Sequence, residues 1–189
     1  IYFSYAAGLA WLYAARAARP ARWYALSGLL LAGAALSKYF AALLGFALLI
    51  DALASGERRG EKMRGLLIAY ACVIPALLLM AWWNAGHCWV NVMFNFFNRH
   101  RGAGLNAATP ALYAGTLLYV LTPPALWLWW KTRAIKGPMS GLWLLAAVPF
   151  ALFALMSLAK TIGLHWLLGF VPLVLLWLAL RLPEATLSR

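Results

Sequence analysis

The chain has 189 residues and a net charge of +12; it is 66% hydrophobic, and only 11% of its residues are charged. Soluble domains carry about 25% charged residues, so the composition excludes an ordinary soluble domain and predicts a membrane protein. The cations lie in short segments between apolar runs, which excludes nucleic acid as the reason for the positive charge.

The chain begins at Ile1 inside an apolar run that lacks the basic flank and cleavage site of a signal peptide. We therefore expect a fragment of a longer protein. The first predicted span is Ile1–Ala15, and residues 16–22 form a basic segment after it. Trp23–Ala54 is a 32-residue apolar stretch, too long for one span of roughly 20 residues and short for two. We predict a pair of short helices that turn at Lys38.

A basic loop is predicted over Ser55–Gly65, and Leu66–Trp83 is predicted to span the membrane with a kink at Pro75. The following stretch, Trp82–Arg101, has helical periodicity and two faces of different chemistry. One face carries amides and an imidazole, and the other carries mainly aromatic side chains: Asn84, His87, Asn91, Asn95 and Asn98 against Trp89, Met93, Phe96 and Phe97. This pattern is typical of a helix that lies in a membrane interface. We predict an external interfacial helix and loop over residues 84–108.

Thr109-Pro110 predicts the start of the next helix, which continues to Trp130 through a kink at Pro123-Pro124. The remaining segments are a basic loop, a span containing Pro149, a short turn, a last span and a polar tail: Lys131–Lys136, Gly141–Ala159, Lys160–Gly163, Leu164–Leu180 and Arg181–Arg189. The predicted fold is all-α, a polytopic transmembrane helix bundle of about seven hydrophobic helices in a single domain, residues 1–189.

The basic residues also predict an orientation. If residues 16–22 are cytoplasmic, twelve of the sixteen Lys and Arg residues lie inside and four lie outside. A bias of this size over short loops predicts a multi-pass protein of the bacterial inner membrane. The predicted periplasmic face gathers the four remaining cations and all three histidines: Lys38, Arg99, Arg101, Lys160, His87, His100 and His165. All four acids are predicted at the inner face or its boundary.

Basic groups delivered to one face by distant turns predict a site for a phosphate or pyrophosphate. Other interpretations stay open for each group. Lys38 and Lys160 suit lysines that extend to lipid headgroups, and residues 99–101 suit a solvated helix end. The pair His165-Trp166 suits an interfacial aromatic belt, and the asparagines suit hydrogen bonds to neighbouring loops.

The sequence indicates neither a cofactor nor a disulfide. Cys72 and Cys88 are sixteen residues apart on a predicted helical path, too far for a disulfide. The spacing of Cys88 and the three histidines matches no zinc pattern. A requirement for a divalent metal is left open.

Two motifs resemble a known family. Leu36–Leu44, with the sequence LSKYFAALL, resembles the L-[ST]-K-Y turn of the polyprenyl-phosphate-dependent GT-C glycosyltransferases, the protein mannosyltransferase and aminoarabinose transferase-like enzymes. Trp83–Val90, with the sequence WNAGHCWV, is followed by Phe94 and Arg99 and resembles the W-N-x-x-H-x-W…F segment of that family. The resemblance covers about Trp23 to Arg101.

The resemblance implies transfer of a sugar from a polyprenyl-phosphate donor to a periplasmic acceptor, which is lipid A, another glycan or a protein. It implies a donor-phosphate site with Lys38, Tyr39, Arg99, Arg101 and Lys160. Residues that would orient the sugar or the loop are Asn84, His87, Trp89, His100, His165 and Trp166. Such enzymes use an external carboxylate, which this chain lacks in the predicted topology. We expect the catalytic carboxylate outside this fragment.

Two other functions remain open from the sequence. A transporter or flippase fragment would bind the same lipid-linked sugar, but it predicts ionisable groups around a central site within the membrane. A non-catalytic membrane scaffold would use its external cations only to contact membrane lipids.

Overall fold

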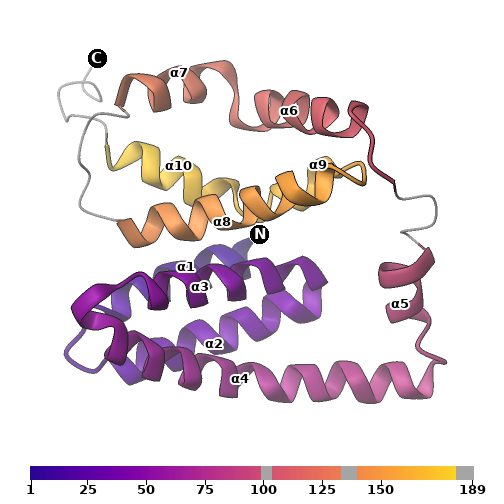
Figure 1. Ribbon diagram of the computed structural model, residues 1–189. Helices are drawn as coiled ribbons and strands as arrows, with labels where there is room; N and C mark the ends of the chain where they lie inside the picture. The colour runs from indigo at the N-terminus through magenta and orange to yellow at the C-terminus, as the bar shows by residue number, and fades with distance from the viewer. Residues whose placement is uncertain (99–103, 133–139, 182–189) are drawn as a thin grey trace.

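The computed structural model describes residues 1–98, 104–132 and 140–181. All regular secondary structure in these residues is helical (Figure 1), which confirms the predicted all-α class. Elements from the N-terminal half form one group of packed helices, and elements from the C-terminal half form a second group against it (Figure 1).

The N-terminal group consists of α1 (Tyr2–Ala14), α2 (Pro20–Ser37), α3 (Ala42–Leu53) and α4 (Arg59–Gly86). Helix α2 packs against both α1 and α4. A Cβ atom at Gly28 of α2 would lie 2.3 Å from the carbonyl oxygen of Ala69 in α4. This crossing therefore requires glycine, because no side chain fits between the two backbones.

The predicted turn at Lys38 is confirmed. Helix α2 ends at Ser37, and Lys38 has extended backbone angles (φ −165°, ψ 130°). The 3-10 helix η1 (Tyr39–Ala41) then leads into α3. Phe40 anchors this turn to the C-terminal half, because its ring packs 4.3 Å from the ring of Trp166. The apolar stretch is thus two short helices whose junction projects Lys38 and Tyr39 at one end of the bundle.

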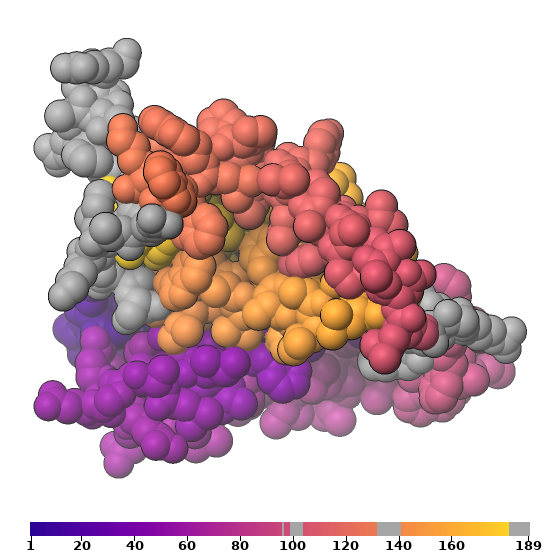
Figure 2. Space-filling model, turned by 45° about the horizontal axis from the view of Figure 1, so that its top comes forward, coloured from indigo at the N-terminus to yellow at the C-terminus, as the bar shows by residue number. Residues whose placement is uncertain are grey.

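The C-terminal group consists of α6 (Ala108–Leu121), α7 (Pro123–Thr132), α8 (Ser140–Ser157), α9 (Leu164–Leu167) and α10 (Val171–Ala179). Helix α8 packs against α3 on one side and α10 on the other. Helices α6 and α7 lie over α8 and α10 (Figures 1 and 2). The Tyr113 hydroxyl of α6 donates to the Phe150 carbonyl of α8 at 2.7 Å, and this bond holds α6 against α8.

Two predicted boundaries are wrong in this part of the fold. Most of the expected loop Ser55–Gly65 is helical, because α4 begins at Arg59 after the 3-10 helix η2 (Gly56–Arg58). Arg, Glu, Lys and Met are good helix formers, and Glu61 in the first turn suits the helix N-terminus. The expected last span, Leu164–Leu180, is broken between α9 and α10, next to Pro172 at the start of α10.

The expected kink at Pro123-Pro124 is a complete break. Helix α6 ends at Leu121, and α7 begins at Pro123 after a bend of 87°. Thr122 between them has left the helical conformation (φ 59°, ψ 145°). A residue that precedes proline is disfavoured in the helical conformation, which explains why the break falls at this position.

The continuous helix predicted over Trp82–Arg101 is also wrong. Helix α4 ends at Gly86, and Cys88 and Trp89 adopt left-handed backbone angles (φ 53° and 55°). A short helix, α5 (Val90–Val92), and a π-helical turn, η3 (Met93–Phe97), follow. The segment leaves the end of α4 and runs toward the C-terminal group (Figure 1). The single stripe of polar side chains is therefore divided between two elements.

A bundle of about seven membrane spans is not supported. Among the described residues, one helix is long and apolar enough to cross a bilayer, Gly56–Gly86, and the bent pair α6–α7 passes the same test only when its helices are taken together. Helices α1, α3 and α10 have 13, 12 and 9 residues. At 1.5 Å per residue they are about 20, 18 and 14 Å long, against about 30 Å of hydrocarbon.

Candidate functional site

A pocket joins the two motifs at one end of the N-terminal group. Its volume is about 510 Å³, and it is lined from the end of α2, from η1, from the last turns of α4 and from the α5–η3 segment. The polar and aromatic lining residues are Ser37, Lys38, Tyr39, Phe40, Trp83, Asn84, Asn91 and Asn95. Four predicted features therefore meet here: the Lys38 turn, Tyr39, Asn84 and part of the asparagine stripe.

Asn84 holds an unusual position in this pocket. Its side chain is 3% exposed, and its amide nitrogen donates to the Met80 carbonyl one turn back in α4, at 2.7 Å. Its Oδ1 atom is buried and has no hydrogen-bond partner within the described part of the chain. A buried polar atom without a partner costs about 1–3 kcal/mol. Asn84 therefore contains a buried acceptor that the described protein groups do not satisfy.

Asn91 and Asn95 reach the same pocket from beyond the turn. The side-chain amide of Asn95 donates to the Asn91 carbonyl at 2.8 Å and to the Asn91 side chain at 3.1 Å. These contacts orient the two amides relative to each other. The turn at residues 87–89 breaks the predicted helix, yet it returns these asparagines to the pocket that Asn84 lines.

A second, smaller pocket lies on the other side of the Lys38 turn. Its volume is about 120 Å³, and Lys38, His165 and Trp166 line it together with the start of α1. The Lys38 Nζ atom donates to the His165 carbonyl at 3.1 Å. The Trp166 indole donates to the imidazole Nε2 of His165 at 2.9 Å. The structure therefore places Lys38 in contact with the His165-Trp166 turn.

Trp166 itself is a core residue. It is 4% exposed and packs against Phe40 and Phe153, at ring-centroid distances of 4.3 and 6.2 Å. Its ring packs beneath the Lys38 turn, and the sugar-orienting role of Trp166 stays a prediction. His165 is exposed beside it. Trp166 thus holds the Lys38 turn in place through its contact with Phe40.

His87 and Trp89 lie in the turn after α4, and both are exposed. The His87 ring stacks on Trp83 at 4.0 Å, and its Nδ1 atom lies 2.7 Å from the Trp83 carbonyl. Trp83 lines the larger pocket, so His87 contacts a lining residue and does not itself line the pocket. Trp89 is 47% exposed and does not line the 510 Å³ pocket.

Lys160 lies in the turn between α8 and α9. The backbone of Gly104 and Asn106 donates to the carbonyls of Ala159 and Leu158, at 3.3 and 3.2 Å, next to this lysine. The loop that follows the Arg99–Arg101 segment therefore docks beside Lys160. Arg99, His100 and Arg101, which were predicted to hold the phosphate and orient the loop, lie outside the described residues.

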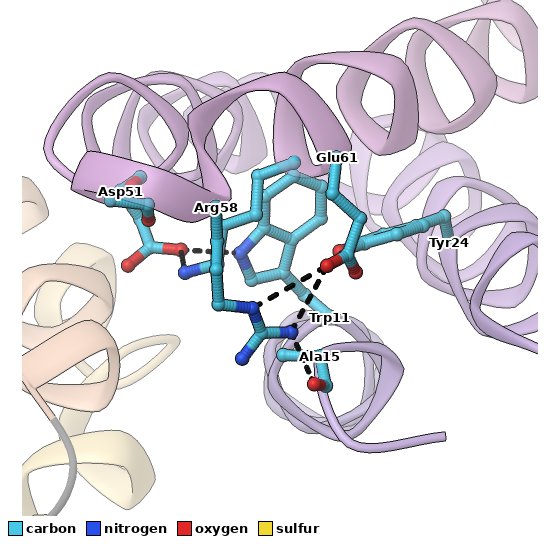
Figure 3. A network of polar contacts seen from close by, with 8 residues as sticks. Trp11, Ala15, Tyr24, Asp51, Arg58 and Glu61 are labelled. Atoms are coloured by element: carbon cyan, nitrogen blue, oxygen red, sulfur yellow. Dashed lines mark hydrogen bonds and ion pairs between the residues drawn. The ribbon is translucent and has the colours of Figure 1, made fainter. Parts of the chain in front are cut away.

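The three described acids, Asp51, Glu57 and Glu61, lie at the end of α3 and the start of α4, at the other end of the N-terminal group, and Figure 3 shows the network around Asp51 and Glu61. The Asp51 carboxylate accepts from the Trp11 indole at 2.8 Å and from the Lys62 ammonium at 2.5 Å, and Asp51 is 2% exposed. Glu61 pairs with Arg58 at 3.3 Å and accepts from the Tyr24 hydroxyl at 3.1 Å. Helix α4 has 28 residues, so these groups lie about 40 Å from its other end.

Sequence reasoning missed the Asp51–Lys62–Trp11 network, although a single Asp in an apolar helix was a usable signal. It also missed Trp83 as a pocket wall. Among the described residues, no group of three or more His, Cys, Asp and Glu side chains could hold a metal ion. Cys72 and Cys88 are both free thiols, as predicted.

No family model, curated protein or solved structure matches this chain. The resemblance to the GT-C glycosyltransferases therefore stays a prediction that rests on the two motifs and on the pocket that they share.

Proposed function

We propose that this chain is part of an integral membrane glycosyltransferase of the bacterial inner membrane. It transfers a sugar from a polyprenyl-phosphate donor to a periplasmic acceptor, which is lipid A, another glycan or a protein. The observation that carries the proposal is the 510 Å³ pocket, in which Lys38 and Tyr39 of one motif face Trp83 and Asn84 of the other. Tyr39 of the first motif and Trp83 of the second are 44 positions apart in the sequence, yet both line one cavity.

An apolar groove continues from this pocket and supports a lipid-linked substrate. It lies between α2, α3 and α4, has a volume of about 670 Å³, and shares Ala35, Tyr39 and Met80 with the polar pocket. Its other walls are almost entirely aliphatic and aromatic. An amphiphile with a polar head in the pocket and an isoprenoid chain in the groove matches this division of chemistry.

The outer surface of these helices supports a membrane location. Leu67 and Leu78 of α4 are 68% and 64% exposed, and Phe46 of α3 is 55% exposed. Extended exposed apolar surfaces are rare on soluble monomers and suit contact with lipid tails. Helix α4 is also the described helix whose length and composition suit a membrane span.

In the proposed reaction, Lys38 binds the phosphate of the donor. The acceptor hydroxyl attacks the anomeric carbon, and the bond between that carbon and the phosphate oxygen breaks. The departing polyprenyl phosphate takes the bonding electron pair, and the ammonium of Lys38 stabilises the charge that it gains. The hydroxyl proton passes to a carboxylate base, which we place outside this chain because its three described acids lie at the opposite end of α4.

A transporter or flippase would place ionisable groups around a central path. The ionisable pair inside the described bundle is Asp51–Lys62, and its carboxylate is enclosed by the Trp11 indole. That arrangement suits a structural contact better than a path, so we rank transport second and a non-catalytic scaffold third.

The proposal is tested on the intact protein that contains this chain, reconstituted in lipid nanodiscs. Lys38→Ala should weaken binding of a short-chain polyprenyl phosphate at least ten-fold, because one charged hydrogen bond to phosphate is lost. It should also abolish sugar transfer, as should Arg99→Ala. Arg59→Ala, an exposed cation at the other end of α4, is the matched control and should change neither. Equal binding by the wild type and Lys38→Ala would refute the donor-phosphate assignment.

Cys88 tests the proposed orientation. It is an exposed, free thiol in the turn at the pocket end of the molecule. A membrane-impermeant maleimide should label it in intact spheroplasts, where only the periplasmic face is accessible. Labelling that requires broken membranes would place the pocket on the cytoplasmic face.

A further inference from the structure

A second cavity lies in the C-terminal group, and its chemistry differs from that of the 510 Å³ pocket. It lies between α6, α7, α8 and α10 and has a volume of about 200 Å³. All its lining residues are hydrophobic, and they include Leu121, Trp129, Trp143, Phe150, Val174 and Trp177. Among the described residues, the two cavities share no lining residue. The proposed sugar transfer therefore does not use this cavity.

The break between α6 and α7 lies beside this cavity. Leu121 before the break and Ala125 after it both line the cavity, and the two helices diverge there by 87°. Water does not fill a cavity with purely apolar walls, and a cavity that stays empty destabilises a fold. Pockets that enclose a whole small molecule have volumes of about 300–1,000 Å³, so this one suits a segment of an apolar chain.

Two basic side chains lie at one end of the cavity. Helices α7 and α10 end, and α8 begins, on the same side of the molecule (Figure 1). The Arg181 guanidinium lies 4.1 Å from the ring centroid of Trp177, which lines the cavity. The Lys131 Nζ atom lies 4.8 Å from the ring centroid of Trp127, in the last turns of α7. Both cations are thus held by tryptophans at this end.

The lining changes in character along the cavity. Trp129, Trp143 and Trp177 each lie within one turn of the end with the two cations, and the rings of the last two are 4.7 Å apart. Phe150 and Val174 line the cavity further from that end. The order from cation to tryptophan to aliphatic residue matches the order from headgroup to interface to acyl chain in a phospholipid.

The carboxylate at the start of α8 does not oppose an anion here. A Cβ atom at Gly141 would lie 2.8 Å from Asp51 Oδ1, so Asp51 lies close to this end of the C-terminal group. Lys62 donates to the Asp51 carboxylate at 2.5 Å and Trp11 donates to it at 2.8 Å, so its charge is neutralised within the N-terminal group. An anionic headgroup at the cavity therefore meets the positive charge of Lys131 and Arg181.

We infer that this cavity binds one acyl chain of an anionic glycerophospholipid, whose phosphate is bound by Lys131 and Arg181. In the predicted orientation these cations face the cytoplasmic leaflet, whose anionic lipids attract basic pockets between membrane helices. The inference rests on the membrane location that the proposed function includes, and it does not depend on sugar transfer. The site holds a structural lipid that fills the space beside the α6–α7 break.

The experiment measures lipid binding to the intact protein that contains this chain, purified in detergent and stripped of lipid. Native mass spectrometry gives dissociation constants for phosphatidylglycerol, for phosphatidylcholine with the same acyl chains, and for a short-chain polyprenyl phosphate. Phosphatidylglycerol should bind about ten-fold more tightly than phosphatidylcholine, because two cations near an anionic headgroup raise its affinity. Equal constants for the two phospholipids would overturn the inference.

Paired substitutions test the two cations. Lys131→Gln with Arg181→Gln should lower the ratio of the two phospholipid affinities from about ten to about one. Arg22→Gln with Arg59→Gln is the matched control, because it removes two exposed cations near the starts of α2 and α4, outside the cavity. This control should keep the wild-type ratio. An equal loss in both double variants would assign the preference to general surface charge and would contradict a specific site.

A substitution in α8 tests the apolar part. Ala147→Leu places a larger side chain in the cavity, so it should weaken the binding of phosphatidylglycerol about ten-fold. Without lipid, its melting temperature should equal or exceed that of the wild type, because the side chain fills apolar space. Ala154→Leu, at an exposed position of the same helix, should change neither value. Unchanged binding by a folded Ala147→Leu variant would place the acyl chains elsewhere.

A photoreactive lipid keeps the test valid if Ala147→Leu does not fold. Phosphatidylglycerol with a diazirine in the middle of an acyl chain should crosslink to Leu121, Phe150 or Val174, as located by peptide mass spectrometry. Crosslinks confined to outward-facing residues such as Leu155, which is 64% exposed, would show only general contact with lipid and would overturn the inference.

The two lipid sites are distinguished by exchanging the variants. Lys38→Ala should bind phosphatidylglycerol as the wild type does, and the Lys131 and Arg181 double variant should bind the polyprenyl phosphate as the wild type does. If the polyprenyl phosphate does not bind but the phospholipid preference holds, the proposed function fails and this inference survives. If the double variant loses the polyprenyl phosphate, the cavity belongs to the carrier site and the inference is wrong.

Discussion

The polar side chains at the two ends of α4 have different environments. At the start of the helix, acids and bases meet each other: Lys62 contacts Asp51, and Arg58 contacts Glu61. At the other end, Lys38 and three asparagines line an open pocket, and a buried amide oxygen of Asn84 has no partner among the described residues.

The difference teaches how this chain divides stability from recognition. The Asp51 network joins α1, α3 and α4, and its carboxylate also lies against the start of α8, where a Cβ atom at Gly141 would be 2.8 Å from Asp51 Oδ1. It therefore closes the bundle. At the pocket end, Lys38 and the asparagines line a cavity and donate to backbone carbonyls instead of to acids. Substitutions at the first end should affect folding, and substitutions at the second should affect binding.

The largest expected effect comes from breaking the buried ion pair. Asp51→Ala leaves the Lys62 ammonium buried without its counter-ion, and we expect a loss of about 3–5 kcal/mol in the free energy of unfolding. The measurement is chemical unfolding in detergent micelles. The double substitution Asp51→Leu with Lys62→Met should recover most of the loss, because two apolar groups replace two charges. If the double variant is as unstable as Asp51→Ala, the pair contributes more to the free energy of unfolding than the mutual neutralisation of two buried charges.

The next prediction tests whether the buried aromatic residues beneath the Lys38 turn stabilise the pocket end. Trp166→Ala removes a buried ring beneath the Lys38 turn and should cost about 3–5 kcal/mol. Trp166→Phe keeps most of the contact with Phe40 and should cost less than half as much. If Trp166→Ala is as stable as the wild type but the intact protein loses sugar transfer, Trp166 acts in the site and not in the core.

A smaller effect is expected at the α2–α4 crossing between the two ends. Gly28→Ala places a methyl group against the Ala69 backbone, which cannot move aside as a side chain can, and should cost about 2–3 kcal/mol. The matched control is Gly115→Ala in α6, where a Cβ atom meets nothing within 4 Å. That change should stabilise the protein by about 0.5–1 kcal/mol through the higher helix propensity of alanine. Equal melting temperatures for the two variants would contradict the close crossing.

The smallest loss of stability is expected at Lys38, and it is measured against the loss at Lys62. Lys38→Ala removes an exposed hydrogen bond to the His165 carbonyl and should cost about 1 kcal/mol or less. Lys62→Ala leaves the Asp51 carboxylate buried and unpaired, and it should cost about 3–5 kcal/mol. Thermal unfolding of both variants side by side measures the contrast. Similar losses would show that the Lys38 end also carries the stability of the bundle.

Much of the secondary structure was predictable, because it depends on local pattern. The turn at Lys38 followed from the length of one apolar stretch. A kink was expected at Pro123-Pro124, where the structure has a full break, and the break before Pro172 was not predicted. The start of α4 and the end of the same helix at Gly86 were mispredicted. Element boundaries depend on capping and docking as well as on pattern, so they are the least predictable feature of a sequence.

The candidate site was predictable in part. The motifs around Lys38 and Asn84 suggested one site, and both line the same pocket. The periodicity of residues 82–101 placed Asn84, Asn91 and Asn95 on one face of a straight helix, whereas in the structure a turn at residues 87–89 comes between Asn84 and the other two, and all three line the pocket. Trp166 is buried against Phe40, a contact that sequence alone does not show, because it depends on which side of a short helix meets that ring.

By itself, the sequence determined the helical class, the apolar character and the separation of the acids from the outlying cations, because composition and spacing are properties of the chain. Only the tertiary structure decided that Lys62 meets Asp51, that Lys38 and Asn84 line one cavity, and that an apolar groove adjoins that cavity. Those features arise where helices distant in sequence pack together, and packing depends on which faces fit across a crossing such as that at Gly28.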